Sequence, residues 1–311
     1  MRSITRFGLV ACAVAVTLVL AGCRGGDPAG TAPGELGAGG TAFELLTQSG
    51  SYHRQQHTLT VAEERLVGSC MAARGLAYPA EAPVAVVASD EERSLRLEQR
   101  HREGYGLFQS FAADPADGQR SPSPVDRYVQ RLSSEEQAAY MLELFGDERR
   151  RKGIRLARSG DVTFPGQGCV FESQSRIFGD IMTWARITYV TEDLNNKLTE
   201  WVVATSAYTE AMRGWGGCMA QRGHPYPSPG DAKDDLSARY TAEGTSDRLR
   251  RHEIAVAVAD AECAAQGGIP RLVLSLKESH VGALSAEERR SLVELANAWS
   301  HAVTVAEGIA G

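Results

Sequence analysis

C-M-A-Q-R-G-H-P-Y-P occupies residues Cys218 to Pro227, and a close copy, C-M-A-A-R-G-L-A-Y-P, occupies residues Cys70 to Pro79. The two decapeptides agree at seven of ten positions across a separation of 148 residues. One further cysteine follows each copy, Cys169 after the first and Cys263 after the second. The repetition predicts two related halves, each organised around a cysteine near the end of a helix.

Each decapeptide has the residue types of a helix that ends in a turn. Gly75 supplies the left-handed backbone conformation that closes many helices, and the proline after the tyrosine cannot continue a helix. Upstream of the first copy, Thr60 and Glu63 have the spacing of a capping box, which predicts that this helix begins at Thr60. Tyr78 and Tyr226 stand in the two turns. They either pack back on the preceding helix, which we favour, or present a contact surface for a ligand.

The composition is that of a folded, mildly acidic protein. Apolar residues make up 43% of the 311-residue chain, which is enough to build a sizeable core. The formal net charge is -6, and it becomes -8 once Arg2 and Arg6 leave with an N-terminal signal. An acidic surface disfavours phosphate backbones, so we expect no nucleic-acid partner.

The N-terminus has the pattern of an export signal, residues 1–22. Two arginines precede an apolar stretch, and Leu20-Ala21-Gly22-Cys23 places small residues directly before a cysteine. This segment is similar to the lipobox of bacterial lipoproteins, which implies cleavage before Cys23 and a diacylglyceryl group, with acyl chains such as palmitate, on the Cys23 thiol. Residues 23–40 are rich in Gly, Ala and Pro and predict a flexible tether. The expected location is the extracytoplasmic face of the cell membrane, with membrane lipid as a partner through the Cys23 anchor.

The first half is expected to span residues 41–190. Its expected elements are a helix from the capping box of Ser133 and Glu136, a short strand or hairpin arm within 161–168, a helix from Gly168, and a helix over 181–190.

The second half is expected to span residues 191–311 and to be essentially all helix. Its expected elements are one helix or two in series over 194–222, a helix from Ser246 or Asp247, and a helix from the capping box of Ser285 and Glu288. Gly214-Trp215-Gly216-Gly217 predicts an interruption, because glycines weaken a helix. A polar loop is expected from the second decapeptide to about residue 245. The predicted fold class is mainly α, with two related disulfide-bonded halves and at most a short β element in the first half.

Four cysteines remain once Cys12 leaves with the signal and Cys23 is lipidated, an even number in an exported protein. They admit three disulfide connectivities. We favour Cys70 with Cys169 and Cys218 with Cys263, because each repeat then has its own bond in the same order. A zinc site is the alternative, but no C-x-x-C spacing is present and no histidine lies three to five residues from these cysteines, so we expect no metal.

The chain lacks the recognisable catalytic motifs. No G-x-S-x-G, H-E-x-x-H or phosphate-binding loop occurs, and Val256 stands where a second zinc-binding histidine would follow His252-Glu253. His53 and His57 are four residues apart, but two ligands do not make a metal site. A hydrolase with dispersed carboxylates remains an alternative, and its candidate residues are Asp180, Glu200 and Glu253.

The lipobox, the C-M-x-x-R-G-x-x-Y-P motif and the later helical cysteines resemble a group of uncharacterised lipoproteins of actinobacteria. The resemblance includes Gly104-Tyr105-Gly106, the Phe-Gly-Asp segments at 145–147 and 178–180, and Ala259-Asp260-Ala261-Glu262-Cys263. It implies an envelope location, a helical fold and disulfides, and it implies no reaction. We therefore expect a non-enzymatic binding or accessory protein without a cofactor, whose partner is an envelope protein or ligand.

Overall fold

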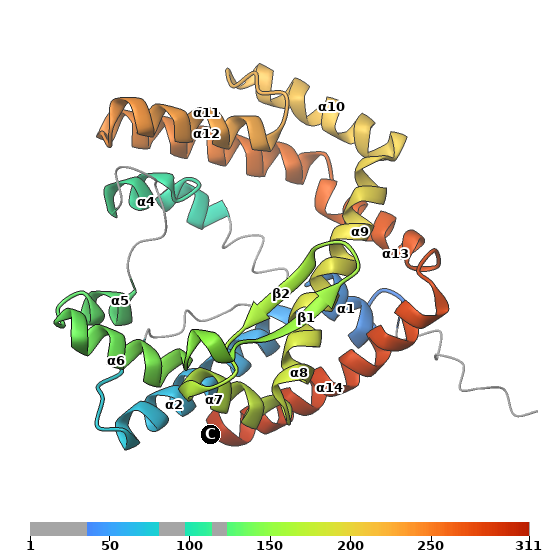
Figure 1. The fold of residues 1–311 in the computed structure, drawn as a ribbon. Coiled ribbons are helices and arrows are strands. Elements are labelled where there is room, and N and C mark those ends of the chain that lie inside the picture. Colours follow the sequence, from blue (N-terminus) through green and yellow to red (C-terminus); the bar gives the residue numbers. More distant parts are fainter. Residues whose placement is uncertain (1–35, 81–96, 114–122, 311) are drawn as a thin grey trace, which may run out of the picture. The chain divides into compact units, whose positions relative to one another are not determined.

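The computed structural model describes residues 36–80, 97–113 and 123–310, and these residues are mainly helical (Figure 1). The signal segment 1–22, Cys23 and most of the predicted tether lie outside the described residues. Within the described ranges, the one sheet is an antiparallel hairpin of β1 (Lys152–Leu156) and β2 (Gly160–Phe164). The mainly α fold class is therefore confirmed, together with a single short β element in the first half.

The described helices begin and end as follows. Before residue 191 they are α1 (Thr41–Thr47), α2 (Tyr52–Ala73), residues 97–103, α4 (Leu107–Ala113), α5 (Pro124–Val129), α6 (Ser134–Phe145), the 3-10 turn η1 (Glu148–Arg150), α7 (Gly168–Phe178), α8 (Ile181–Ala185) and the π-helical turn η2 (Arg186–Val190). After it they are α9 (Thr191–Val203), α10 (Ser206–Gln221), α11 (Pro229–Glu243), α12 (Asp247–Gln266), α13 (Ile269–Val281) and α14 (Ala286–Ala310).

Three predicted helix starts are correct because serine side chains satisfy backbone N–H groups that the first turn leaves without a partner. Ser133 caps α6 and its own N–H donates to Glu136 at 2.8 Å. Ser246 accepts from the N–H of Leu249 at 3.2 Å at the start of α12. The capping box of Ser285 also precedes α14.

The predicted start at Thr60 is wrong, because α2 already begins at Tyr52. Thr60 lies inside the helix, where its hydroxyl donates to the carbonyl of Gln56 at 3.0 Å. The helix continues through this point because Leu59 and Ala62, which flank Thr60, are buried in the core. Burial of an apolar face outweighs a local capping signal.

The predicted interruption at 214–217 is also wrong, because these residues lie within α10. Trp215 is 1% exposed and its indole N–H donates to Asp260 at 3.1 Å, so packing and a hydrogen bond hold the glycine-rich turn in the helix. The chain breaks earlier, between α9 and α10. There Thr205 accepts from the N–H of Tyr208 at 3.2 Å and caps α10.

The polar loop expected before residue 245 is instead the helix α11. Ser228 caps it and Pro229 occupies its first turn, which is a favourable place for proline. Ala232, Leu236 and Tyr240 recur every four residues and are buried. This narrow apolar stripe is the helical signal within an otherwise polar stretch.

The end of the predicted tether belongs to the folded body. Leu36 packs against the largest core cluster, and the N–H of Ala38 donates to Glu278 at 2.8 Å. Gly40 is the residue that precedes α1. The expectation of a flexible segment up to residue 40 is therefore wrong for residues 36–40.

The largest core cluster combines helices from both predicted halves. Helices α2 and α14 lie side by side (Figure 1). Tyr52 stacks on Trp299 with ring centroids 5.2 Å apart, and the indole N–H of Trp299 donates to Gln55 at 2.6 Å. In a separate cluster, α4 packs against α11 and α12, and Phe111 stacks on Tyr240 at 5.4 Å. The hydrophobic cores thus cross the division at residue 190.

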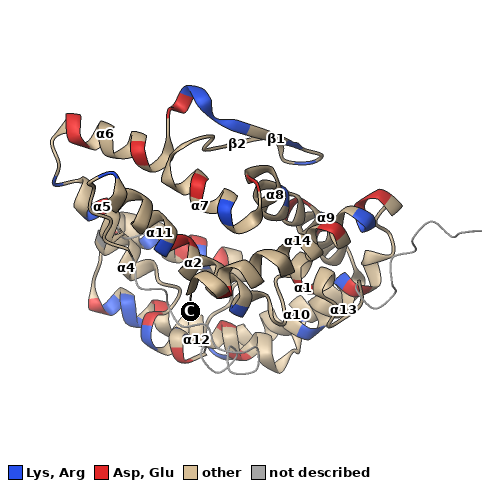
Figure 2. Ribbon diagram, turned by 90° about the horizontal axis from the view of Figure 1, so that it is seen from below, with Lys and Arg blue, Asp and Glu red and all other residues tan. Residues whose placement is uncertain are grey.

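Acidic and basic residues are interspersed along the described helices (Figure 2). The basic run 149–152 connects η1 to β1, and within it Arg149 pairs with Asp147 at 2.8 Å and Arg151 with Glu148 at 3.4 Å. Among the described helices, none combines the length and the apolar character needed to cross a bilayer.

Candidate functional site

The two decapeptides adopt the same helix-ending turn. Gly75 and Gly223 have φ angles of +75° and +83°, a conformation that residues with a Cβ rarely adopt. The N–H of Leu76 donates to the carbonyl of Met71 at 3.0 Å, and that of His224 donates to the carbonyl of Met219 at 2.9 Å. These bonds satisfy carbonyls at the helix end, so the predicted helix stop is confirmed in both copies.

The shared cysteine and methionine attach each turn to its neighbouring helices. Disulfides join Cys70 to Cys169 and Cys218 to Cys263, which confirms the favoured connectivity. The methionine after the first cysteine of each pair, Met71 or Met219, is completely buried. With their sulfurs in disulfides, none of the four cysteines is available as a thiolate nucleophile.

The shared arginine forms an ion pair beside each disulfide. Arg74 contacts Glu172 at 2.6 Å, three residues after Cys169, and Arg222 contacts Glu262, one residue before Cys263. Both pairs are partly exposed and contribute little to stability individually. They indicate that the shared cysteine, methionine and arginine of the decapeptide hold the fold.

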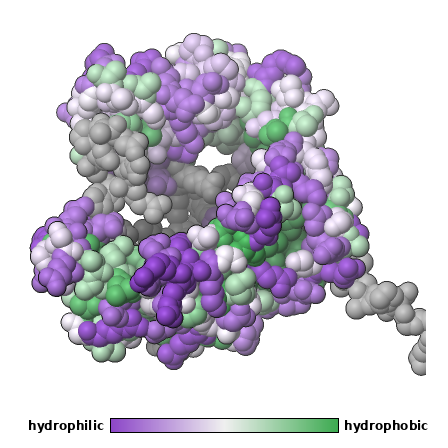
Figure 3. Space-filling view, viewed as in Figure 1, coloured by the Kyte–Doolittle hydropathy of each residue, from purple (hydrophilic) through white to green (hydrophobic). Residues whose placement is uncertain are grey.

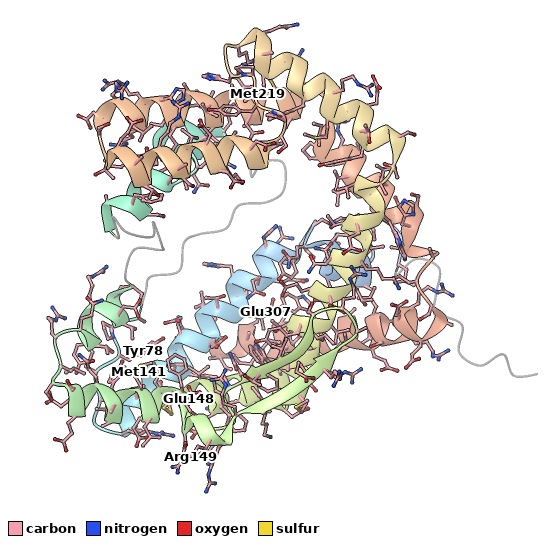
Figure 4. The ribbon with its side chains drawn as sticks, turned by 45° about the horizontal axis from the view of Figure 1, so that its top comes forward. Tyr78, Met141, Glu148, Arg149, Met219 and Glu307 are labelled. Carbon is pink, nitrogen blue, oxygen red and sulfur yellow. A yellow bond between two sulfur atoms is a disulfide. The ribbon has the colours of Figure 1, made fainter. Side chains whose placement is uncertain are left out.

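The first turn borders the larger of the two cavities described here, a groove of about 760 Å³. Helices α2, α5 and α6 form its walls. The apolar lining includes Val67, Val125, Val129, Met141, Leu144 and Phe145. Tyr78 and Met141 lie close together in Figure 4, at the side of this groove. We call it the Tyr78 groove.

The outer edge of the Tyr78 groove is unusually apolar. Met141 and Phe145 are 43% and 36% exposed, and both line the groove. Figure 3 shows hydrophobic surface over the region of α5 and α6, among largely hydrophilic surroundings. Exposed apolar side chains that gather at a concave surface are typical of binding sites.

The inner wall of the Tyr78 groove is acidic. Burial, reinforced by the charge of Glu64, raises the pKa of Glu63, although the amide of Gln174 donates to Glu63 at 2.9 Å and opposes this rise. Tyr78 donates a hydrogen bond to Glu64, and burial together with this carboxylate raises the pKa of the phenol well above its usual value. Asp126 on α5 is a third carboxylate of the lining.

The second turn borders a smaller, polar cavity of about 260 Å³. The ring centroids of His224 and His252 lie 5.9 Å apart in its wall. Burial lowers the pKa of both histidines. The phenol of Tyr226 donates to Asp235 at 2.7 Å. Burial is the main cause, and this hydrogen bond the second, of a rise in the pKa of the phenol to about 12.

The candidate contact residues Tyr78 and Tyr226 thus each line a cavity while also packing against the fold. The sequence patterns did not indicate most of the other residues that line the two cavities. Glu63 drew attention only through its spacing from Thr60, and its side chain lies in the groove. His224 and Pro225 carry a signal that was available, because the two decapeptides differ at these positions and both line the smaller cavity.

The three carboxylates proposed for a hydrolase are not brought together in either cavity. Asp180 accepts from the N–H groups of Met182 and Thr183 at the start of α8. Glu200 pairs with Arg158. Glu253 is completely buried and accepts from the backbone N–H groups of Tyr105, Leu107 and Phe108.

The described residues offer no constellation for metal chemistry. His53 and His57 both lie on α2, and His53 packs edge-on against Tyr52 with ring centroids 5.4 Å apart. In the described ranges, no group of three or more His, Cys, Asp or Glu side chains is placed to hold a metal ion. What the geometry offers is an apolar groove with an acidic wall. Comparison with protein-family models, curated proteins and solved structures found no match for this chain.

Proposed function

We propose that this protein is a lipid-anchored, extracytoplasmic binding protein of the cell envelope, without enzymatic activity, whose ligand occupies the Tyr78 groove. The observation that carries the proposal is the groove itself. Its volume of about 760 Å³ lies within the usual range of about 300–1,000 Å³ for small-molecule pockets. Its lining is mostly apolar, and its polar groups include those from α2 (Glu63, Glu64), from α5 (Asp126) and from α6 (Gln137).

The disulfide beside the groove supports a preformed site. Cys70 on α2 is joined to Cys169 on α7, and Val67 and Val170, which line the groove, lie close to these cysteines in sequence. Tyr140 of α6 is completely buried and donates to the carbonyl of Ala77 at 3.1 Å, which attaches the turn to the opposite wall. A rigid site loses less conformational entropy on binding.

The anchor is proposed from the N-terminal sequence. Diacylation of Cys23 supplies two acyl chains, enough for stable membrane attachment. Metabolic labelling with a palmitate analogue should label the protein, and Cys23→Ser should abolish labelling and release the protein from membranes. Persistent labelling of the variant would contradict the assignment of Cys23.

Binding is tested with decyl maltoside, a neutral amphiphile, by isothermal titration calorimetry below its micelle concentration. We expect saturable binding to the folded protein. Met141→Ser should weaken it by about fivefold, because a partly exposed apolar contact of about 1 kcal/mol is removed. Leu142→Ser is the matched control, since Leu142 is 51% exposed on the same helix and does not line the groove.

Two results would contradict this proposal. One is the absence of saturable binding. The other is an equal loss of affinity in the Met141 and Leu142 variants, which would locate the contact outside the groove. The alternative of a carboxylate hydrolase has less support, because Asp180, Glu200 and Glu253 are each engaged in capping, an ion pair or backbone hydrogen bonds.

A further inference from the structure

The smaller cavity, of about 260 Å³, brings together hydrogen-bonding side chains from three elements. His224 and Tyr226 belong to the second turn, and His252 belongs to α12. Asp235 and Arg239 belong to α11, which lies beside α12 (Figure 1). A cavity with a few convergent polar groups is typical of a binding site, and its volume, just below the usual range of about 300–1,000 Å³, suits a small ligand.

The two decapeptides differ at this cavity. His224 and Pro225 stand where the first copy has Leu76 and Ala77. Both copies nevertheless form the same turn, with a left-handed glycine and the same backbone hydrogen bond. The turn therefore forms with either leucine or histidine at this position, and the imidazole of His224 adds a polar group to the cavity instead of a condition for folding.

His252 has an atom that points to a ligand. Its Nε2 is buried and has no hydrogen-bond partner among the described residues. The ring of His224 lies beside it, with centroids 5.9 Å apart. Buried polar atoms are nearly always hydrogen-bonded, so an unpaired one in the wall of a cavity calls for a partner that can occupy the cavity.

The charges around His252 favour an anion. Burial is the main cause of its lowered pKa, the positive charges of Arg239, His224 and Arg248 lower it further, and the charge of Asp235 opposes them. Helix α4, which also packs against α12, has no ionisable side chain. A proton on His252 thus lacks a sufficient counter-charge, and a bound anion would supply one.

Asp235 does not serve as that counter-charge, because it is already engaged. It accepts from the phenol of Tyr226 at 2.7 Å and pairs with Arg239 at 3.0 Å. The guanidinium of Arg239 has five N–H donors in all, so it can contact Asp235 and a second acceptor. Charge-assisted hydrogen bonds from a guanidinium and from imidazolium rings are strong contacts for an oxyanion.

We propose that the smaller cavity binds a small oxyanion, such as a carboxylate, phosphate or sulfonate group, at His224, His252 and Arg239, together with a proton on the imidazole pair. This site is separate from the Tyr78 groove and independent of the ligand proposed there. Linked binding is reciprocal, so an anion that favours the protonated rings must bind more tightly as the pH falls.

The test uses methanesulfonate, which is a monoanion throughout the pH range, and follows the histidine ring signals of the purified protein by NMR at constant ionic strength. Dimethyl sulfone, its neutral isostere, is the control ligand. We expect saturable shifts of the His224 and His252 signals with methanesulfonate and none with the sulfone. The affinity for methanesulfonate should rise about fivefold from pH 7.5 to pH 5.

Two variants locate the binding. His224→Leu introduces the side chain that the first decapeptide has at this position, and it should weaken binding at pH 5 about threefold. His252→Asn should weaken it about fivefold and remove most of the pH dependence. His301→Asn, at an exposed position of α14, should leave binding unchanged. The same spectra report folding, and the pH profile of the unmodified protein tests the proposal without any variant.

Three results would overturn the assignment. The first is the absence of saturable shifts at His224 and His252. The second is equal binding of methanesulfonate and the sulfone, or equal affinity at the two pH values. The third is tighter binding of tetramethylammonium, which would make Asp235 the anchor of a cation site. None of these outcomes depends on whether an amphiphile binds the Tyr78 groove.

Discussion

Tyr240 donates a hydrogen bond of 2.7 Å to Glu253, and the two side chains are 1% and 0% exposed. Glu253 also accepts from the backbone N–H groups of Tyr105, Leu107 and Phe108 at 2.8, 2.9 and 3.0 Å. This carboxylate holds the start of α4 against α11 and α12. Gly104 is required there, since a Cβ at this residue would lie 2.8 Å from the carboxylate and its φ is +64°.

Glu253→Gln should lower the free energy of unfolding by about 3 kcal/mol, because the amide replaces one acceptor by a donor among several buried N–H groups. Tyr240→Phe should lower it by about 1–2 kcal/mol by removing a single donor to a charged acceptor. Urea denaturation measures both. Glu243→Gln is the control, as an exposed residue that pairs with Arg248. A change below about 0.5 kcal/mol in the Glu253 variant, as expected for surface sites, would show that this cluster is not a stability determinant.

Removing either disulfide should destabilise the protein substantially. The bonds close segments of 99 and 45 residues, Cys70–Cys169 and Cys218–Cys263. Chain-entropy arguments give a loss of about 4–5 kcal/mol for each pair of Cys→Ala substitutions, with smaller values if the unfolded chain retains structure. Thermal denaturation measures the loss, and non-reducing peptide mapping checks the pairing. A disulfide between the two halves in that map would contradict the structure.

Tyr226 is expected to stabilise the second turn. Tyr226→Phe removes the hydrogen bond to Asp235 and should lower stability by about 1 kcal/mol, while Tyr226→Ala also removes packing and should lower it by about 2–3 kcal/mol. Tyr208→Phe, which removes a phenol hydroxyl from α10 and not from the turn, is the control. Unchanged stability of the alanine variant would favour a role of Tyr226 as a contact surface.

Acid should destabilise the protein through His224 and His252. Because their folded pKa values lie below the unfolded value of 6.5, the unfolded chain takes up protons first as pH falls. Stability should therefore decrease from pH 7.5 to pH 5. The lowered pKa values of Asp235 and Glu288 reduce stability only at more acidic pH, around and below their unfolded values of 3.8 and 4.5. The raised pKa of Glu63 has the opposite effect on stability, because there the folded chain takes up the proton first.

The measurement is urea denaturation at pH 7.5 and pH 5. His252→Asn should reduce the difference between the two pH values, whereas His301→Asn, at an exposed position of α14, should leave it unchanged. If the His252 variant keeps the full acid sensitivity, another group is responsible for it.

Local rules explain which elements could be predicted. The serine caps of α6, α12 and α14 and the glycine ends of α2 and α10 depend on a few neighbouring residues and occur where expected. The failures occurred where packing overrode a local signal. Trp215 keeps a glycine-rich segment helical, and the buried stripe of α11 makes a helix from a polar stretch.

Several residues on which the resemblance to actinobacterial lipoproteins rests make hydrogen bonds or ion pairs within the fold. Tyr105 donates its phenol hydrogen to Asp260 at 3.0 Å, and Glu262 pairs with Arg222. Asp147 and Asp180, in the two Phe-Gly-Asp segments, both cap the helical turn that follows. The family assignment itself stays a prediction, as do the lipid anchor and the envelope location.

By itself, the sequence determined the helical class and the form of the two turns, because caps and left-handed glycines act over short distances. The order of the repeats favoured one of three possible disulfide pairings, and the structure contains that pairing. Only the tertiary structure shows which helices share a core, that Glu63 and Glu64 line a groove, and that Glu253 is buried. The contacts of Glu253 span 148 residues to Tyr105 and only 13 to Tyr240. Such a site depends on desolvation by segments distant in sequence, and no local pattern in the chain encodes it.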